Sequence, residues 1–184
     1  MKNLIKIIVL SNFLISMAHA NSNVNGIYFG IGGALSTSTN DVITNEGKYT
    51  LTYKENSYKA LVGKRLNDKV VAELQIVSFT KGDITINGIL VPLPMSGSSF
   101  GVTGLYYFNS NEDFSPFVKL GLHSWSIEIE GASLSREFNG TDIFYGIGVD
   151  GKINETMKYR IEFESMDMDG DSMNNFGAVL LIDI

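Results

Sequence analysis

The chain has 184 residues, a formal net charge of −6, 44% hydrophobic residues and no cysteine. One compact domain accounts for this length, the acidic balance argues against a nucleic-acid partner, and stabilisation by disulfides is excluded. Glycine is abundant, proline is scarce and no long segment has a helical period, which together predict an all-β domain.

The N-terminus is typical of a Sec-type signal peptide. A basic start is followed by an apolar run from Ile7 to about Met17 and by the small residues of Ala18-His19-Ala20. The apolar run is too short for a spanning helix, and a buried N-terminal helix is the alternative. We predict a cleaved signal peptide at residues 1–20 and one domain at residues 21–184. In that domain, any membrane insertion would use strands, because no apolar run reaches the length of a spanning helix.

The first predicted strand, Gly26–Ser36, has two unlike faces. Ile27, Phe29 and Ile31 lie on one face, and small residues dominate the other. Small residues on one face of a strand suit a tightly packed, curved interior. A polar loop, Ser38–Lys54, is predicted to follow.

The second and third predicted strands, Asn56–Leu66 and Lys69–Thr80, alternate in the same way. Only Asn67-Asp68 separates them, which is the length of a hairpin connection. A second long loop, Lys81–Gly97, is predicted after the third strand.

The fourth predicted strand, Ser98–Phe108, leads through a short turn, Asn109–Ser115, into the fifth. The fifth strand sets apolar residues from Val118 to Leu122 opposite Lys119. Beyond Leu122 the formerly apolar face continues with Ser124, Ser126, Glu128 and Glu130. A strand that leaves lipid and enters water has this pattern, and a β-bulge that exchanges the two faces is the competing interpretation.

The last three predicted strands complete a set of eight. They are Thr141–Lys152, Thr156–Glu164, and a strand that ends at Ile184. Thr156–Glu164 alternates strictly between apolar and charged residues. This pattern suits a soluble sheet, with its charges in water, and equally a membrane barrel, with its charges inside.

Two regularities favour the membrane barrel. Long and short connections alternate along the chain, as they do in up-and-down membrane barrels. Aromatic residues also gather near both strand ends, as expected of two interfacial girdles. The predicted girdles are Tyr106, Phe108, Phe117 and Tyr159 at the short-turn end, and Phe79, Phe100, Phe144 and Phe176 at the long-loop end.

These patterns resemble the small eight-stranded outer-membrane β-barrels of Gram-negative bacteria, a group that includes the OmpA transmembrane domain, the OmpX/Ail adhesins and the opacity-type surface proteins. The resemblance rests on the signal peptide, the opening Gly26–Gly33, the Ser115–Leu122 segment after a short turn, and the alternating C-terminal strand. It covers nearly all of the domain. One departure is the last residue, Ile184, because such barrels usually end in an aromatic residue that the assembly machinery reads.

The resemblance implies an eight-stranded antiparallel up-and-down transmembrane β-barrel in the outer membrane. The predicted lipid-facing residues are Ile27, Phe29, Ile31, Leu74, Ile76, Leu120, Ile147, Ile161, Phe163, Leu180 and Ile182. The predicted charge network of the lumen is Lys59, Arg65, Glu73, Lys119, Asp150, Lys152, Arg160, Glu162 and Glu164, with Asp183 as a further candidate. Side chains just fill the interior of eight strands, so opposite charges are expected to pair there. A gated, narrow ion path is the alternative.

Three motifs point elsewhere and are weighed against simpler interpretations. Gly146–Gly151 matches a dinucleotide fingerprint by letters, but a turn and a strand follow it where that motif needs a helix. Asp167–Asp171 resembles the start of a calcium loop, but its glycine is misplaced for an EF-hand, so a tight acidic loop is favoured. His123 could serve a lipid-A hydrolase with Ser124 or Ser126, but on a regular strand it faces the side opposite both.

The sequence thus predicts a non-enzymatic barrel without a cofactor, with a structural or adhesin-like role. Its expected partners are outer-membrane lipid, lipopolysaccharide, the outer-membrane assembly machinery and a host or cell-surface ligand at the long loops. The alternatives are a narrow pore, a lipid-A-modifying enzyme and a soluble, lipocalin-like barrel that binds an apolar ligand.

Overall fold

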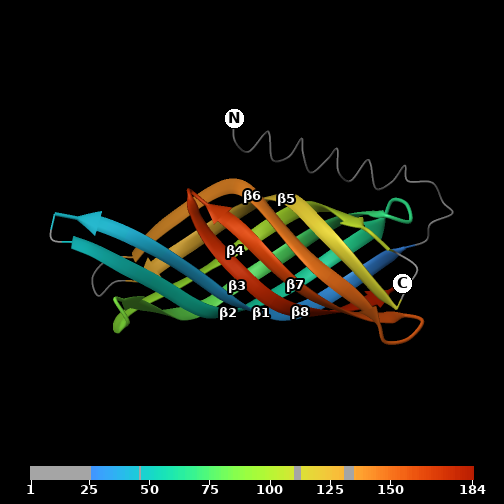
Figure 1. Cartoon of the computed structure of the whole chain (residues 1–184), viewed down its shortest axis with the longest axis horizontal. Helices are drawn as coiled ribbons and strands as arrows, with labels where there is room; N and C mark the ends of the chain where they lie inside the picture. Colours follow the sequence, from blue (N-terminus) through green and yellow to red (C-terminus); the bar gives the residue numbers. More distant parts are fainter. Residues whose placement is uncertain (1–25, 46, 110–112, 131–134) are drawn as a thin grey trace.

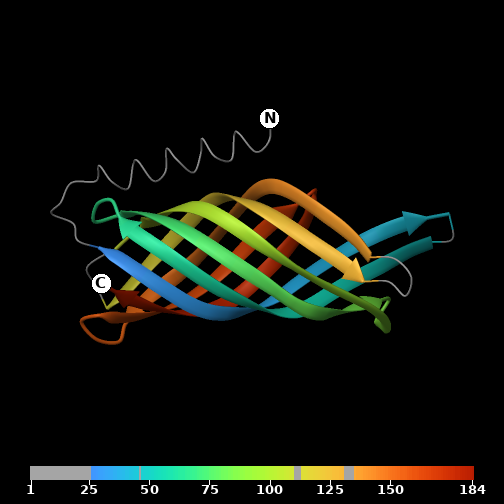
Figure 2. The same ribbon diagram turned by 180° about the vertical axis from the view of Figure 1, so that it is seen from behind.

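The computed structural model describes residues 26–45, 47–109, 113–130 and 135–184, and the predicted signal peptide lies outside the described residues. Each strand pairs antiparallel with its neighbour in sequence, and β8 pairs with β1 to close a barrel (Figures 1 and 2). The strands are β1 (Ile27–Thr44), β2 (Gly47–Arg65), β3 (Val70–Ile86), β4 (Ile89–Tyr107), β5 (Phe114–Glu130), β6 (Ser135–Lys152), β7 (Met157–Met168) and β8 (Asp171–Asp183). The predicted all-β, eight-stranded, antiparallel up-and-down barrel is confirmed. In the described part of the chain, no helix is long and apolar enough to cross a membrane.

One end of the barrel, here called the turn end, carries both termini of the strand array (Figure 1). The backbone nitrogen of Ile184 donates to the carbonyl oxygen of Ile27 at 3.0 Å, which closes the wall there. Two asparagines shape its turns, because their side chains accept from backbone N–H groups that would otherwise lack partners. Asn67 Oδ1 accepts from Val70 at 2.9 Å, and Asn154 Oδ1 accepts from Met157 at 2.9 Å.

At the opposite end of the barrel, here called the hairpin end, the strands are longer than predicted. The two predicted loops, Ser38–Lys54 and Lys81–Gly97, are instead continuations of β1, β2, β3 and β4. Asn87 (φ 50°) and Gly88 (φ 82°) alone connect β3 to β4. Asn-Gly between apolar residues is a strong hairpin signal, and here it would have revealed the continuous strands.

The wall of the barrel is lower at β7 and β8 than elsewhere. β7 has 12 residues and β8 has 13, whereas β1 to β6 have 17 to 19. Pairing of β1 with β8 ends at Thr37, and pairing of β6 with β7 begins at Phe144. Above the two-residue turn Asp169-Gly170, the described residues therefore leave a notch between the edges of β1 and β6 (Figure 1).

The interior is built in three layers. An apolar layer near the turn end contains Tyr28, Leu61, Val71, Leu105, Tyr107, Phe117, Val179 and Leu181. A charged layer lies above it. A second apolar layer near the hairpin end contains Tyr53, Val77, Phe79, Trp125, Ile127, Phe144, Met166, Met168 and Met173.

Small residues make room for the inward-facing aromatic side chains. A Cβ atom at Gly63 would lie 2.2 Å from the Tyr28 ring, and one at Gly148 would lie 2.5 Å from the Phe117 ring. Gly63 and Gly148 are thus positions over which interior rings pack. On the first strand, a Cβ atom at Gly30 would instead meet the side chains of Leu61 and Leu181.

Candidate functional site: the charged interior and the outer surface

The outer surface around the charged layer is apolar. All eleven residues predicted to face lipid point outward and are exposed or half-buried, with Ile31 at 63% and Leu120 at 64% exposure. An apolar surface this extensive is unusual for a soluble monomer. We call the part of the barrel that carries this surface the band region.

Toward the hairpin end the two faces of the strands exchange character, and we call this part the mouth region. On β5, Val118, Leu120 and Leu122 face outward in the band region, and Ser124, Ser126, Glu128 and Glu130 continue the same face in the mouth region. The inward positions change the opposite way, from Lys119 and His123 to Trp125 and Ile127. β5 pairs with β4 and β6 without a register shift, so a bulge does not cause the exchange.

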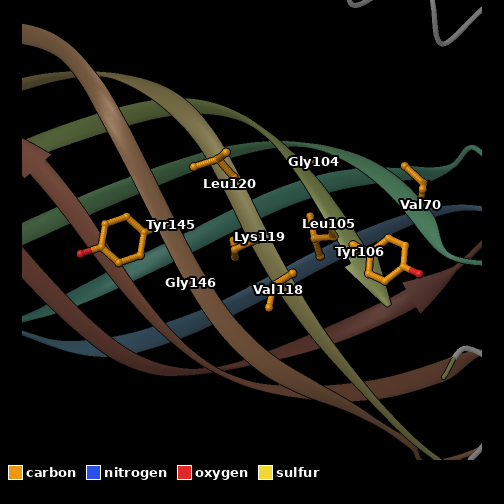
Figure 3. Close-up of a pocket in the computed structure, with 9 residues that line it drawn as sticks. All are labelled: Val70, Gly104, Leu105, Tyr106, Val118, Lys119, Leu120, Tyr145 and Gly146. Atoms are coloured by element: carbon orange, nitrogen blue, oxygen red, sulfur yellow. The ribbon is translucent and has the colours of Figure 1, made fainter. Parts of the chain in front are cut away.

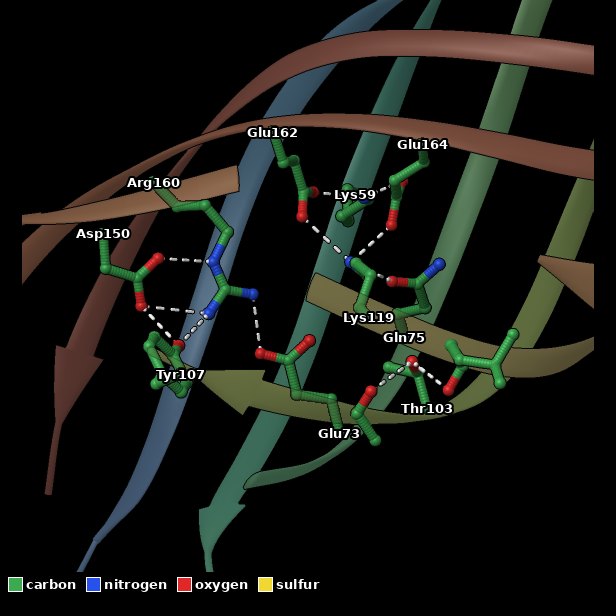
Figure 4. A network of polar contacts seen from close by, with 12 residues as sticks. Lys59, Glu73, Gln75, Thr103, Tyr107, Lys119, Asp150, Arg160, Glu162 and Glu164 are labelled. Carbon is green, nitrogen blue, oxygen red and sulfur yellow. Dashed lines mark hydrogen bonds and ion pairs between the residues drawn. The ribbon is translucent and has the colours of Figure 1, made fainter. Parts of the chain in front are cut away.

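The first group of the charged layer is centred on Arg160 of β7, which is fully buried. Its Nε donates to Asp150 Oδ1 at 2.7 Å, and its Nη1 donates to Glu73 Oε1 at 2.6 Å (Figure 4). Its Nη2 donates to the Tyr107 hydroxyl at 2.9 Å, and Tyr107 donates to Asp150 at 2.6 Å. The guanidinium also lies 4.6 Å from the centre of the Phe117 ring. Paired and hydrogen-bonded in this way, a buried guanidinium and two carboxylates are tolerated.

The second group joins two lysines to two glutamates across the lumen. Lys119 of β5 lies 2.9 Å from Glu162 Oε2 and 2.5 Å from Glu164 Oε1 (Figure 4). Lys59 of β2 forms ion pairs with the same two glutamates. The void beside Lys59, Glu162 and Glu164 has no room for a water molecule.

Strand β7 therefore supplies three consecutive inward side chains to both groups. Arg160, Glu162 and Glu164 alternate with Ile161 and Phe163, which face outward. Their ion-pair partners stand on β2, β3, β5 and β6, and the Tyr107 hydroxyl adds a contact from β4, so the network ties together strands on different sides of the barrel.

Two of the predicted network residues lie elsewhere. The prediction that Lys152 belongs to the charge network of the lumen is wrong. Its side chain is 43% exposed, and it pairs at 2.9 Å with Glu155 in the turn that follows β6. Arg65 is only half-buried, and its guanidinium lies 5.7 Å from the Tyr107 ring centre, outside the two groups. The further candidate Asp183 pairs with Lys158 at 3.0 Å near the turn end.

The predicted aromatic girdles are wrong in part. Phe79, Phe117 and Phe144 are at most 2% exposed and belong to the interior layers. Tyr106, Phe108, Phe100 and Phe176 do lie on the outer surface. The height of a ring along its strand predicts how near it lies to a strand end, whereas the alternation of successive residues decides whether it faces outward or inward.

His123 is an interior residue. Its Nδ1 lies 2.9 Å from the Ser99 hydroxyl, and its Nε2 lies 2.8 Å from the backbone oxygen of Asp167. Ser124, the serine next in sequence, instead donates to the carbonyl oxygen of Gly140 at 3.3 Å. The sequence did not predict the contact between His123 and Ser99. The two residues lie on neighbouring strands, and the sequence alone does not fix the register in which these strands pair.

The other two motifs are ordinary elements of the barrel. Gly146–Gly151 lies within β6, and Asp167–Asp171 forms the end of β7, a two-residue turn and the start of β8. Within the described residues, no group of three or more histidine, aspartate or glutamate side chains is arranged to hold a metal ion.

Two hollows differ in position and lining. A shallow groove of about 560 Å³ lies in the outer wall over Gly104, between Tyr106, Val118 and Leu120 (Figure 3). It is part of the apolar surface of the band region. A cavity of about 420 Å³ opens in the mouth region.

Comparison with known proteins agrees with this architecture. Residues 7–181 match the family described as "Outer membrane protein beta-barrel domain". No functionally curated protein matches the chain.

Several solved structures share the fold. Neisserial surface protein A aligns with a TM-score of 0.65 at 11% identity, over 85% of this chain and 97% of that one. Ail from Yersinia pestis, in complex with the heparin analogue sucrose octasulfate, aligns at 0.59 and 11% identity, over 87% and 99%. OprG from Pseudomonas aeruginosa aligns at 0.57 and 14% identity, over 85% and 93%.

Proposed function

The chain belongs to the family of outer membrane protein β-barrel domains, and from this premise we propose that it is a non-enzymatic barrel of the Gram-negative outer membrane that displays hairpins at the cell surface. Export would use the signal peptide at residues 1–20. The turn end would face the periplasm, because short turns and both strand termini lie on that side in such barrels. Outer-membrane lipid and lipopolysaccharide would then surround the band region.

The observation that carries this proposal is the exchange of polarity along β5. Leu120 and Leu122 would contact lipid, and Ser126 and Glu128 would contact water beyond the membrane surface. In a soluble barrel of the lipocalin type, the outward apolar residues would be exposed to water, which is unfavourable.

Cell fractionation and a heat-modifiability gel test the proposal. We expect the protein in the outer-membrane fraction, as a compact, detergent-resistant species that changes its mobility after boiling. Recovery in the aqueous periplasmic fraction without detergent would instead support the soluble barrel.

A structural role for the lumen is favoured over a pore. The charged layer is filled by paired side chains, and an apolar layer lies on each side of it. We expect planar bilayers that contain the protein to show no discrete conductance steps. Discrete openings that are lost in Arg160→Met would favour the narrow ion path.

The alternative of a lipid-A-modifying enzyme lacks support from the geometry around His123. A serine hydrolase needs an acid to orient the histidine, and His123 contacts a backbone carbonyl oxygen at that position. We expect unchanged lipid A in cells that express either the wild-type protein or His123→Ala.

A surface-interaction role is proposed for the hairpins. Of the lysines in the mouth region, Lys48 pairs with Asp41 and Lys81 pairs with Glu130. Lys54 and Arg136 are the remaining exposed cations of the described mouth region, which also carries Asp41, Glu128, Glu130 and Glu137. This balance is unfavourable for a polyanion such as the heparin analogue bound by Ail, so an uncharged or cationic surface is the better partner. Removal of residues 38–54 should abolish attachment of cells to such a surface, and unchanged attachment would contradict this role.

Assembly would rely on the C-terminal strand. Ile182 in β8 and Ile184 just after this strand are exposed and keep the outward alternation. We expect Ile184→Phe to assemble at least as efficiently as the wild type, measured as the heat-modifiable fraction after a pulse of expression.

A further inference from the structure

The mouth cavity is lined mainly by apolar side chains from seven of the eight strands. Its apolar lining residues are Leu51, Tyr53, Ile84, Met95, Trp125, Ile127, Ile129, Phe138, Met168 and Met173. Its volume of about 420 Å³ lies within the range of small-molecule sites, and an apolar lining is characteristic of them. Three methionines adapt their shape easily to a bound apolar group.

Hydrogen bonds hold two of the three aromatic rings of the cavity, Trp125 and Tyr53, in place. Trp125 Nε1 donates to Asp142 Oδ2 at 2.7 Å, and the Tyr53 hydroxyl lies 2.6 Å from Glu55 Oε2 and 2.8 Å from the backbone oxygen of Met95. Asp142 also accepts from the backbone nitrogen of Asp169 at 3.2 Å, which joins the β7–β8 turn to the Trp125 wall. The cavity is therefore formed before any ligand arrives, which lowers the entropic cost of binding.

The notch above β7 and β8 gives the cavity a side entrance. Ser38 and Asn40 of β1, and Phe138 of β6, belong both to the lining and to the strand segments that lack a neighbour at the notch. Asp169 and Asp171 lie at the lower edge of this entrance, and both are exposed. They are the only charged residues among the described residues that line the cavity.

We propose that the mouth cavity binds a small cationic amphiphile, with its apolar body among the rings and methionines and its positive head beside Asp169 and Asp171. This proposal does not rest on adhesion by the hairpins, although the β1–β2 hairpin supplies part of the cavity lining. The floor of the cavity is the second apolar layer, near the hairpin end, and the paired charges lie beneath this layer. The site therefore captures its ligand and does not pass it through the barrel.

Trp125 is the only tryptophan of the chain, so its fluorescence reports on the cavity alone. The wild-type protein in phosphatidylcholine nanodiscs is titrated with 11-bromoundecyltrimethylammonium and, separately, with 11-bromoundecanoate. The two probes share a bromine that quenches tryptophan at short range and differ in the charge of the head. We expect saturable quenching by both, with half-saturation at a roughly tenfold lower concentration of the cation, a ratio reasonable for contact with acidic side chains.

Three variants separate the cavity from simple partition into the bilayer. Ile84→Gln places an amide in the half-buried lining and should weaken binding of both probes, whereas Ile43→Gln, at a site with 82% exposure outside the lining, should not. The double variant Asp169→Asn with Asp171→Asn should retain binding and lose most of the preference for the cation. Asparagine is suitable at position 169 because it tolerates the positive φ of 58°.

Several outcomes would overturn the proposal. Quenching that stays linear and is equal in the wild type and Ile84→Gln would show partition into lipid only. Half-saturation at equal concentrations of the two probes would show that the cavity has no preference for a cationic head. A Trp125 emission shift that depends on protein concentration without any probe would identify a second copy of the chain as the occupant.

Discussion

The band region and the mouth region use the same strands with opposite polarity. In the band region, apolar side chains face outward, and the interior holds the charged layer above the first apolar layer. In the mouth region, Trp125, Ile127 and the methionines face inward, and serine and glutamate face outward. Alternation with a period of two is therefore a property of the strand, whereas the medium outside each region decides which face is apolar.

The largest expected effect comes from removing the central cation of the band region. Arg160→Met leaves Asp150 and Glu73 buried without their ion-pair partner, which should cost about 3–5 kcal/mol of unfolding free energy. Urea unfolding, followed by the heat-modifiable band, measures the loss.

Lys158→Met on the same strand is the matched control. Its side chain is 25% exposed and pairs with a half-buried Asp183, so its loss should stay within about 1 kcal/mol. Equal losses in the two variants would mean that the interior network contributes no more than a surface pair.

The second prediction contrasts the outer faces of the two regions. Leu120→Arg would place a cation in the apolar surface and should cost about 2–4 kcal/mol in a bilayer. Ser126→Arg, on the same face of β5, should cost less than about 0.5 kcal/mol, as is usual at a surface site. The same unfolding assay in phospholipid vesicles measures both, and similar costs would remove the distinction between the regions.

The third prediction concerns Glu55, a carboxyl in the mouth region. Its outward neighbours Lys54 and Asn56 are exposed polar residues, which places it above the apolar surface. Burial raises the pKa of Glu55 to about 7, against the opposing effect of a hydrogen bond from Tyr53. Its Oε1 has no hydrogen-bond partner among the described residues.

A raised pKa means that the folded state holds the proton more tightly than the unfolded state. The stabilising contribution is complete below the ordinary pKa of 4.5 and is lost as the pH rises to about 7. Glu55→Gln should remove this dependence and stabilise the protein by about 1–3 kcal/mol at pH 8, the cost of an unsatisfied buried group. Unfolding at pH 4 and pH 8 measures the difference, with the exposed Glu128→Gln as control. A variant that remains pH-dependent over this window would contradict the assignment.

The outward and inward faces of the band region could be predicted from the sequence, because alternation is strict there. The clearest case is β7, in which Ile161 and Phe163 face outward and Arg160 and Glu162 face inward. The pairs themselves could not be predicted, since Lys59 reaches Glu162 across more than a hundred residues of chain and around several strands.

The mouth region was harder to predict, because polar residues on its outward face resemble loops. Thr39 and Thr52 are in fact paired strand residues whose hydroxyls lie 3.4 Å apart. The exchange of faces after Leu122 was visible in the sequence, but Asn87-Gly88 was the one local signal that the strands continue.

Site-directed spin labelling along β5 tests the boundary between the two regions most directly. The chain has no cysteine, so single cysteines at Val118, Leu120, Leu122, Ser124, Ser126 and Glu128 give unique labels. In bilayers, we predict collisions mainly with oxygen at the first three positions and mainly with a water-soluble nickel reagent at Ser126 and Glu128. Uniform access to the nickel reagent along the strand, or uniform access to oxygen, would contradict the account.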